Sequence, residues 1–434
     1  MKHRLAAVIG CALLVGACSN DSTTPAVLGE PGSAVNRERT PEVTVPDAYT
    51  AVTVQVLGDP TFPFRGTDGR YHVAYDLQLT NASAVVPATI DSVQVVDGLN
   101  PKRVVAAFTG AQLVDAACDF GDCNRLRLLN ARPLDDATIA PQESRVLFID
   151  FAADSVDELP EVVLHGVSAE AAEGPAAQVA STVDYLAAPA EVRSGEPLSI
   201  GPPVRGDGWV ALNGCCEPGF PHRSSPAPFN GAMSNGQRFA IDWKRMDDNG
   251  RFFEGDKRSN DSYVDYGAEV LAVADGTVVS TLDGMEPNAP GTLPAADPKL
   301  AETITVDTVD GNHIVVDLGD GNYAFYAHLQ AGSLNVTEGD TVKRGDALAK
   351  LGNTGNANAS HLHLHLMDGP SPLGSKPLPY VIDGFQLTGH VAPERLMETD
   401  DFLSGRFNQN MLAEPEPRSD ELPLALDVVA FPQR

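Results

Sequence analysis

Three histidines at alternate positions are the residues of this chain best placed to do chemistry. The run from 359 to 365, Ala-Ser-His-Leu-His-Leu-His, contains His361, His363 and His365. Alternate side chains of an extended strand lie on one face, so the imidazoles share a face and the leucines share the other. A neutral imidazole is a common zinc ligand and titrates near neutral pH. The run therefore predicts a strand that presents a metal-binding or acid–base edge.

Four segments upstream of this run could contribute to the same site. They are Tyr-Ala-His-Leu at 326–329, a glycine-bracketed turn at 352–356, Phe-Ala-Ile-Asp-Trp at 239–243, and an alternating apolar run at 270–279. In this order the segments resemble the M23 family of zinc metallopeptidases, the lysostaphin-type enzymes that cut peptides in bacterial cell walls. The resemblance extends from about residue 197 to about residue 393.

The resemblance implies a zinc site and a role for each polar residue in these segments. A hydrolytic zinc needs about three protein ligands and one open position for water, whose pKa it lowers. By resemblance, His363 and Asp242 are zinc ligands and His361 is the catalytic base. His328 would be the second catalytic histidine, which donates a hydrogen bond to the oxyanion that forms on the carbonyl oxygen. We expect His365 to support a ligand or to lie at the surface.

One position departs from the family pattern. The family usually has His-x-x-x-Asp with both ends bound to zinc, which would place a histidine at position 238, where this chain has Arg238. A guanidinium stays protonated in proteins and has no lone pair to offer a metal. Asp242 and His363 alone would hold zinc poorly, so a third ligand is missing.

Two explanations compete for this missing ligand. In the first, His222, twenty residues before Asp242, supplies the imidazole, and Arg238 holds a substrate carboxylate or a neighbouring acid. The chain resembles M23 members that have a Gln-Arg-aromatic-Ala-aliphatic-Asp segment and an upstream histidine. In the second, the metal site has degenerated and the domain only binds. Retention of Asp242, His328 and both histidines of the His-x-His pair favours the first explanation.

These residues lead to one functional hypothesis and one alternative. The hypothesis is a zinc-dependent metalloendopeptidase that cleaves peptide bonds of bacterial peptidoglycan, with no cofactor besides the metal. The alternative is a catalytically degenerate M23-like lipoprotein that binds the wall or activates another hydrolase. A protease acting on envelope proteins would use the same residues.

The charge of the chain narrows the range of partners. The 434 residues have a formal net charge of -29, with 30 basic and 59 acidic residues. Binding to phosphates needs the opposite sign, so nucleic acid is excluded as an expected partner.

The first residues predict export and a lipid anchor. Residues 1–17 have a basic start and an apolar core too short to span a bilayer, as in a signal peptide. They end in Val-Gly-Ala before Cys18, which resembles the lipobox of bacterial lipoproteins and predicts lipidation of Cys18. The alternative is a plain cleaved signal peptide in which Cys18 is incidental. Residues 18–46 would form a flexible tether. We therefore expect a cell-envelope lipoprotein, anchored in the outer membrane and facing the periplasm.

Four cysteines remain after Cys11 and Cys18. Cys118 and Cys123 flank a short acidic turn, so we expect a local disulfide between them in an oxidising compartment. Adjacent Cys215 and Cys216 either form a bond with each other or stay reduced. A thiolate zinc site on this pair is disfavoured because neighbouring side chains of an extended chain point apart.

The remaining sequence predicts an all-β protein of two domains. Period-two runs at 53–57, 72–79, 90–96 and 145–151 indicate an N-terminal immunoglobulin-like β-sandwich over 47–187, in which His165 is structural. A linker at 188–198 precedes an M23-type antiparallel β-sheet peptidase domain at 199–395. An acidic, proline-rich tail at 396–434 would bury little core, although residues 422–431 could add one strand.

Overall fold

A computed structural model describes residues 43–57, 61–116, 122–130, 132–192, 195–392 and 409–432. These residues belong to one unit, 40–434, whose regular secondary structure is almost entirely β-strand, which confirms the predicted all-β class. The predicted signal peptide, Cys18 and most of the tether lie outside the described residues. No helix in the described part of the chain is long and apolar enough to cross a membrane.

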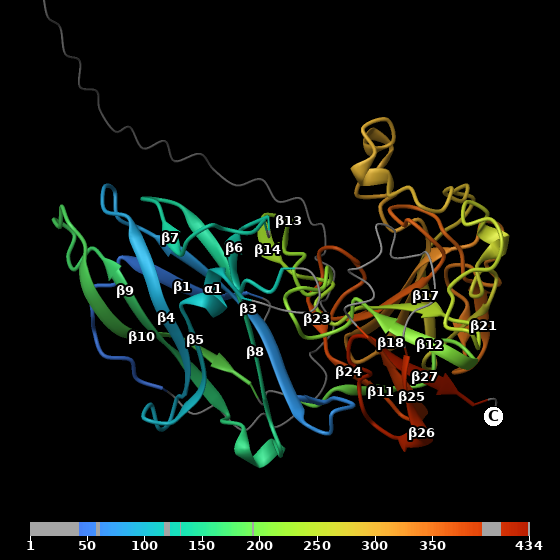
Figure 1. Cartoon of the computed structure of the whole chain (residues 1–434), viewed down its shortest axis with the longest axis horizontal. Helices are drawn as coiled ribbons and strands as arrows, with labels where there is room; N and C mark the ends of the chain where they lie inside the picture. The colour runs from blue at the N-terminus through green and yellow to red at the C-terminus, as the bar shows by residue number, and fades with distance from the viewer. Residues whose placement is uncertain are drawn as a thin grey trace, which may run out of the picture. The chain divides into compact units, whose positions relative to one another are not determined.

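The N-terminal region consists of two antiparallel five-stranded sheets, and Figure 1 labels all of their strands except β2. The first sheet has the order β1-β3-β8-β6, with β2 also on β3, and the second has the order β10-β9-β4-β5, with β7 also on β4. The strands of the first sheet are β1 (Val52–Leu57), β2 (Phe64–Arg65), β3 (Tyr71–Asn81), β6 (Leu126–Leu128) and β8 (Ser144–Ala153). Those of the second are β4 (Ala88–Asp97), β5 (Val104–Thr109), β7 (Thr138–Ile139), β9 (Val162–Ala171) and β10 (Ser181–Glu191).

One apolar core is shared by these two sheets. It contains Val73, Tyr75 and Leu77 of β3 together with Val93 and Val95 of β4. Alternate residues of each strand fill this core, as the period-two pattern of the sequence predicts. We call the two sheets the sandwich; its immunoglobulin-like topology stays a prediction.

A buried histidine lies inside the sandwich and predicts a pH dependence of stability. Nε2 of His165 is 2.7 Å from the Tyr75 hydroxyl, and its Nδ1 donates to the carbonyl of Ala188 at 2.8 Å. Burial lowers the pKa of His165 from 6.5 to about 4. Because the folded-state pKa lies below the unfolded value, the stabilisation is complete above pH 6.5 and is lost as the pH falls toward 4. This loss amounts to roughly 3 kcal/mol at most.

We therefore expect His165→Gln to flatten the decline of the melting temperature between pH 6.5 and 4. The matched control is His390→Gln, because the hydrogen bond with Asp427 raises the pKa of His390. The stabilisation by the His390–Asp427 pair is present below pH 6.5 and is lost as the pH rises. His390→Gln should therefore change the pH dependence of the melting temperature in the direction opposite to His165→Gln. An unchanged acid slope in His165→Gln would contradict the assignment.

The C-terminal region is built on an antiparallel eleven-stranded sheet, which we call the main sheet. Its order is β20-β17-β18-β19-β22-β15-β12-β27-β25-β26, and β23 pairs with β22. Its strands are β12 (Gly206–Leu212), β15 (Ile241–Arg245), β17 (Gly276–Leu282), β18 (Asn312–Gly319), β19 (Asn322–Leu329), β20 (Thr341–Val342), β22 (Leu362–Met367), β23 (Pro377–Leu378), β25 (Phe385–Val391), β26 (Gln409–Arg418) and β27 (Asp427–Phe431).

Short elements complete the described chain. Three two-stranded sheets pair β11 (Leu198–Ile200) with β24 (Tyr380–Ile382), β13 (Ala227–Phe229) with β14 (Ala232–Ser234), and β16 (Glu269–Leu271) with β21 (Ala347–Lys350). The helices are single turns: α1 (Ala111–Val114) and the 3-10 turns Val156–Glu158, Asn260–Ser262, Pro294–Ala296 and Ala301–Thr303.

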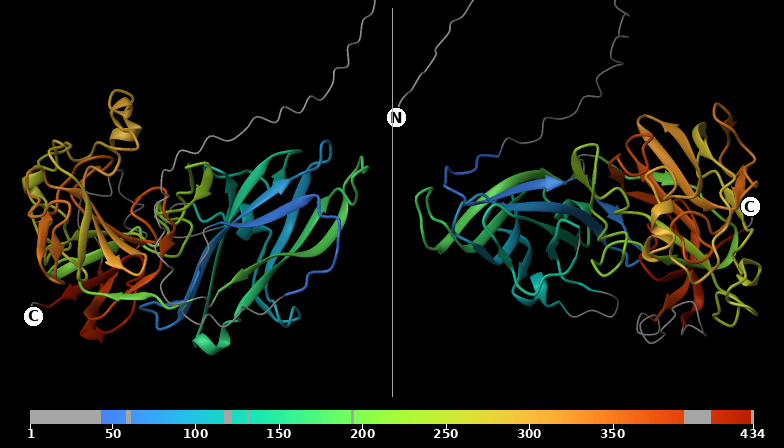
Figure 2. Two further views of the ribbon diagram at one scale, coloured as in Figure 1. Left: turned by 180° about the vertical axis from the view of Figure 1, so that it is seen from behind. Right: turned by 90° about the horizontal axis from the view of Figure 1, so that it is seen from above.

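The C-terminal segment belongs to the main sheet. The expectation that it buries little core is wrong, whereas the strand allowed for within residues 422–431 is present as β27. Strand β27 lies between β12 and β25, and all five of its residues are buried. Figure 2 shows these last strands in red beside the green strand from the middle of the chain. An inner strand covered on both faces needs no polar alternation, so Val-Val-Ala-Phe fits there. Pro415 and Pro417 lie in β26, at the edge of the sheet, where a missing N–H is tolerated.

The predicted linker at 188–198 is also shorter than expected. Strand β10 continues to Glu191, and the register of its pairing with β9 shifts between Ala187 and Ala190. Pro189 lies at this irregularity, where a strand tolerates a residue without an N–H. The sandwich also contributes to the core under the main sheet, through Phe64 and Ala74.

Candidate metal centre

Two neighbouring strands of the main sheet bring Asp242 and His363 together. Strands β15 and β22 are antiparallel, and their register places Asp242 directly opposite His363. Side chains at such positions have Cβ atoms about 4.5–5.5 Å apart. Nδ1 of His363 lies 3.0 Å from Oδ1 of Asp242.

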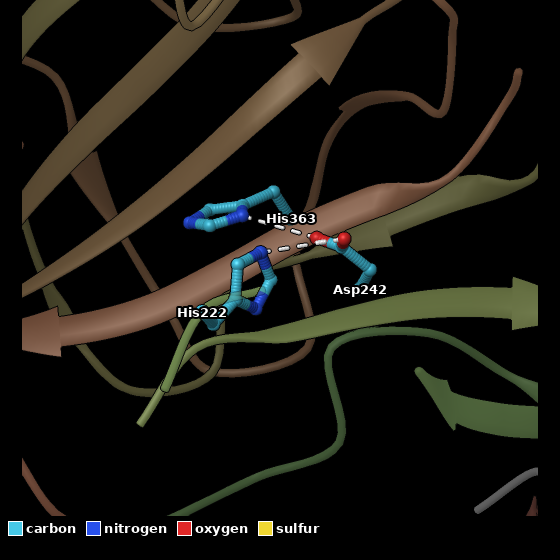
Figure 3. Close-up of side chains that lie close together, drawn as sticks. All are labelled: His222, Asp242 and His363. Carbon is cyan, nitrogen blue, oxygen red and sulfur yellow. Dashed lines mark hydrogen bonds and ion pairs between the residues drawn. The ribbon is translucent and has the colours of Figure 1, made fainter. Parts of the chain in front are cut away.

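His222 reaches the same carboxylate from the loop between β12 and β13. Its Nε2 lies 3.3 Å from Oδ2 of Asp242, and its ring meets that of His363 edge to face at 4.8 Å between centroids. Nδ1 of His222 is 3.1 Å from the carbonyl oxygen of Ala240, which can only accept, so Nδ1 carries the proton and Nε2 presents its lone pair. Figure 3 shows both imidazoles turned toward the carboxylate.

These three residues make a donor set that fits a zinc ion. Their ligand atoms all lie within 4.8 Å of one another, and all three side chains are buried. Two imidazoles and one carboxylate are ligands that zinc accepts, with a fourth position left for water. Burial lowers the pKa of His363 to about 4, which keeps its ring neutral as a ligand must be. Burial alone would raise the pKa of Asp242, but the three neighbouring histidines His222, His361 and His363 lower it well below its usual value.

His328 is aimed at the site by an irregularity in β19. The register between β18 and β19 shifts where Asn312 faces Leu329 and Ile314 faces Tyr326, so two residues of β19 oppose one of β18. His328 is one of the two, with a left-handed φ of 63°. Such a bulge redirects a side chain and is frequent beside active sites. The ring of His328 lies 4.7 Å from that of His361 between centroids.

Backbone carbonyls determine which ring nitrogen of His328 and of His361 carries the proton. Nδ1 of His328 is 2.8 Å from the carbonyl of Thr354, and Nδ1 of His361 is 2.9 Å from the carbonyl of Ala359. A carbonyl only accepts, so both Nδ1 atoms donate and both neutral rings keep a lone pair at Nε2. Nε2 of His361, 3.5 Å from Asp242, is therefore suited to accept a proton. The predicted donation by His328 to an oxyanion requires a proton on its Nε2 as well.

His365 contacts the outer side of a predicted ligand. Nδ1 of His365 lies 2.9 Å from Nε2 of His363, and His365 is buried rather than at the surface. When Nδ1 of His363 offers its lone pair, its Nε2 must carry the proton and donate it to His365. A partner of this kind fixes the tautomer and the ring orientation of a metal-binding histidine.

Arg238 points away from the metal site. Its Nη2 donates to Oδ2 of Asp76 in the sandwich at 2.9 Å, and its side chain is fully buried. A neighbouring acid, rather than a substrate carboxylate, is therefore the partner of Arg238.

Sequence reasoning missed a side chain that supports Asp242. Nδ2 of Asn213 donates to Oδ2 of Asp242 at 2.7 Å. Asn213 directly follows β12, whose last residue Leu212 pairs with Asp242 across the strands. The only signal was its position after a strand, which no motif marks. The backbone carbonyls that accept from the histidines could not be predicted from the sequence either, although the turn at 352–356, which contains Thr354, is part of the family resemblance.

The structure describes one of the two cysteine pairs for which a disulfide was considered. Cys215 and Cys216 form a disulfide with each other, with their Cα atoms 3.1 Å apart, which decides between the two alternatives left open for this pair. Cys123 is disulfide-bonded, whereas Cys118 lies outside the described residues. The pairing of Cys118 with Cys123 therefore stays a prediction.

Residues 257–374 match the family model of peptidase family M23. This segment therefore resembles the M23 peptidases, in agreement with the resemblance found in the sequence. His328, His361 and His363 lie inside the matched segment, whereas His222 and Asp242 precede it.

Solved structures of peptidases are similar to parts of this chain. The catalytic domain of a mutant of EnpA, a prophage-encoded M23 protein from Enterococcus faecalis, is 18% identical over 32% of this chain and 73% of its own, with a TM-score of 0.21. The catalytic domain of lysostaphin from Staphylococcus simulans is 19% identical over 42% and 88%, with a TM-score of 0.20. A zinc-containing peptidase from Vibrio cholerae is 12% identical over 75% and 83%, with a TM-score of 0.21.

Proposed function

We propose that this protein is a zinc-dependent metalloendopeptidase that cleaves peptide bonds in bacterial cell-wall peptidoglycan. The observation that carries the zinc dependence is the convergence of His222, Asp242 and His363, whose ligand atoms lie within 4.8 Å of one another. The match of residues 257–374 to the model of peptidase family M23 supports the reaction class. The peptidoglycan substrate rests on the family resemblance and on the leader that predicts export.

Each histidine around the donor set has a separate role in peptide hydrolysis. When bound, a zinc ion lowers the pKa of water and polarises the scissile carbonyl. His361 accepts the proton of the attacking water at Nε2, because its Nδ1 is already committed to the carbonyl of Ala359. His328 stabilises the charge on the carbonyl oxygen when its Nε2 carries a proton, and His365 keeps the His363 ring in the required tautomer.

Digestion of purified peptidoglycan tests this function. The full chain should create new peptide termini, which mass spectrometry of the released muropeptides identifies. A chelator should abolish the cleavage and added zinc should restore it. A zinc-loaded protein that leaves muropeptides intact but cuts an unfolded protein substrate would refute the cell-wall substrate and retain the peptidase.

The degenerate binding module is the weaker candidate. This hypothesis would require the side chain of Arg238 to occupy the metal position and His222 to lie far from Asp242. In the described residues Arg238 bonds instead to Asp76, and Nε2 of His222 is 3.3 Å from Asp242.

We further propose that Cys18 carries the lipid anchor that holds the enzyme in the outer membrane. The support is the Val-Gly-Ala-Cys end of the predicted signal peptide. A lipidated cysteine with more than one acyl chain gives a stable hold. Cys18→Ala should therefore shift the protein from the membrane fraction to the soluble fraction. Membrane association that survives both this change and a high-salt wash would show that the anchor lies elsewhere.

A further inference from the structure

A carboxylate of the sandwich lies at the centre of a buried network beside the His222 loop. Asp76, on β3, is fully buried and forms ion pairs with Arg223 and Arg238, whose side chains are also fully buried. Its Oδ1 accepts from Arg223, and its Oδ2 accepts from Arg238 at 2.9 Å and from Nδ2 of Asn235 at 3.3 Å. Both oxygens are thus used by groups that come from one segment, residues 223–238.

The first arginine is adjacent to a predicted zinc ligand. Arg223 follows His222 in the same turn, and its Nη2 donates to the carbonyls of Tyr75 and Ile149, each at 2.9 Å. Together with Asp76 these acceptors give the guanidinium three fixed partners on strands β3 and β8. Because a planar guanidinium fits such acceptors in one orientation, Arg223 fixes the turn from which His222 faces Asp242.

The second arginine fixes the group that orients the His222 ring. Arg238 lies two residues before Ala240, whose carbonyl accepts from Nδ1 of His222. Nη2 of Arg238 also donates to the carbonyl of Leu57 in β1 at 3.0 Å. Next to it, Phe239 packs edge to face against Phe64 of β2, with centroids 5.5 Å apart.

A third contact holds the loop before His222. Nη2 of Arg127, on β6, donates to the carbonyl of Pro218 at 3.0 Å. The sandwich therefore contacts the His222 loop on both sides of His222, at Pro218 and at Arg223. His222 is the one predicted zinc ligand that no strand of the main sheet carries, so its position depends on this loop.

The charge balance makes Asp76 hard to replace. Burial alone would raise the pKa of Asp76, but the charges and hydrogen bonds of Arg223 and Arg238 outweigh it and lower the pKa. The carboxylate thus stays ionised between two buried cations. Removing its charge would leave both guanidinium groups uncompensated in a desolvated site, which is strongly unfavourable.

We propose that Asp76 is a positioning residue of the peptidase, through which the sandwich holds His222 at the metal site. This inference rests on the proposed zinc-dependent function. It assigns the N-terminal sandwich a part in completing the site, and it gives Arg238 a new role where the family pattern has a ligand. The sandwich is in this sense a component of the metal centre.

The test compares zinc affinity in full-length variants by competition with a chelator. Asp76→Asn, which keeps the shape and removes the charge, should weaken zinc binding by about 10- to 100-fold, as loss of an outer partner does elsewhere. With cobalt in place of zinc, its visible spectrum should change because one imidazole no longer holds the metal. The matched control is Leu77→Ala, the next residue of β3, whose side chain is buried in the sandwich core and should lower thermal stability without weakening zinc binding.

A second variant keeps the test decisive if Asp76→Asn fails to fold. Arg223→Lys preserves the charge beside Asp76 but loses the planar contacts with Tyr75 and Ile149, and it should also weaken zinc binding and alter the cobalt spectrum. Wild-type zinc affinity and cobalt spectrum in a folded Asp76→Asn or Arg223→Lys protein would overturn the inference and leave the proposed function intact. If the wild-type chain itself binds no zinc, the proposed function fails instead.

Discussion

Replacement of His363 by alanine is expected to remove zinc and peptide cleavage together, whereas His361→Ala should keep most of the zinc and lose turnover. His363 lies opposite Asp242 and offers Nδ1 to the donor set, so its loss leaves two ligands. His361 is excluded from that set and faces it with the lone pair of its Nε2, as a base would. General-base catalysis contributes roughly 10²- to 10⁴-fold, which is the expected loss of kcat in His361→Ala.

The two variants are compared by metal analysis and by the rate of muropeptide cleavage on the same preparations. His390→Ala is the control, because His390 is half-exposed on β25 and pairs with Asp427, outside the metal site. It should match the wild type in both measurements. Normal zinc content and normal cleavage in both His363→Ala and His361→Ala would remove the basis for their assignments.

Replacement of His222 by alanine is the second change with a large expected effect. It removes the ligand that compensates for Arg238, so zinc affinity should fall by more than about 100-fold, beyond the effect of losing an outer partner. The fold should survive, because the loop is also held by Arg223 and by the packing of Phe220 in a small apolar cluster. Calorimetric or chelator titration of zinc measures the change.

His390→Ala is the matched control for His222→Ala as well. It also removes one imidazole, but His390 lies on β25 and pairs with Asp427, outside the donor set. It should bind zinc as the wild type does. Wild-type zinc affinity in His222→Ala would mean that His222 is not a ligand and that another residue completes the site.

Much of the fold could be predicted because burial dictates the spacing of apolar residues. The run at 72–79 alternates clearly and corresponds to β3, whereas the run at 145–151 is apolar over four consecutive residues and corresponds to β8. Strand β27 was harder, because an inner strand buried on both faces loses the alternation that marks a strand. Its composition resembles any short apolar run, and only the pairing with β12 and β25 determines its place.

In the candidate site, too, features that depend on local sequence could be predicted and features that depend on tertiary contacts could not. The spacing of two residues predicts that His361 and His363 share one face of a strand. Because Arg238 stands where the family pattern has a zinc-binding histidine, His222 could be predicted as the third ligand. The partner of Arg238 could not be predicted, because Asp76 lies 162 residues away on another sheet. The roles of Thr354, Ala359 and Ala240 were equally hidden, since backbone carbonyls leave no trace in side-chain identity.

Anomalous diffraction at the zinc edge would locate a metal bound by His222, Asp242 and His363. Crystals of the full chain grown with zinc should give one peak within about 2.0–2.2 Å of Nε2 of His222, Nδ1 of His363 and a carboxylate oxygen of Asp242. A peak that lies elsewhere or lacks His222 among its ligands, or no peak in crystals that contain the metal, would show that these three residues do not form the zinc site.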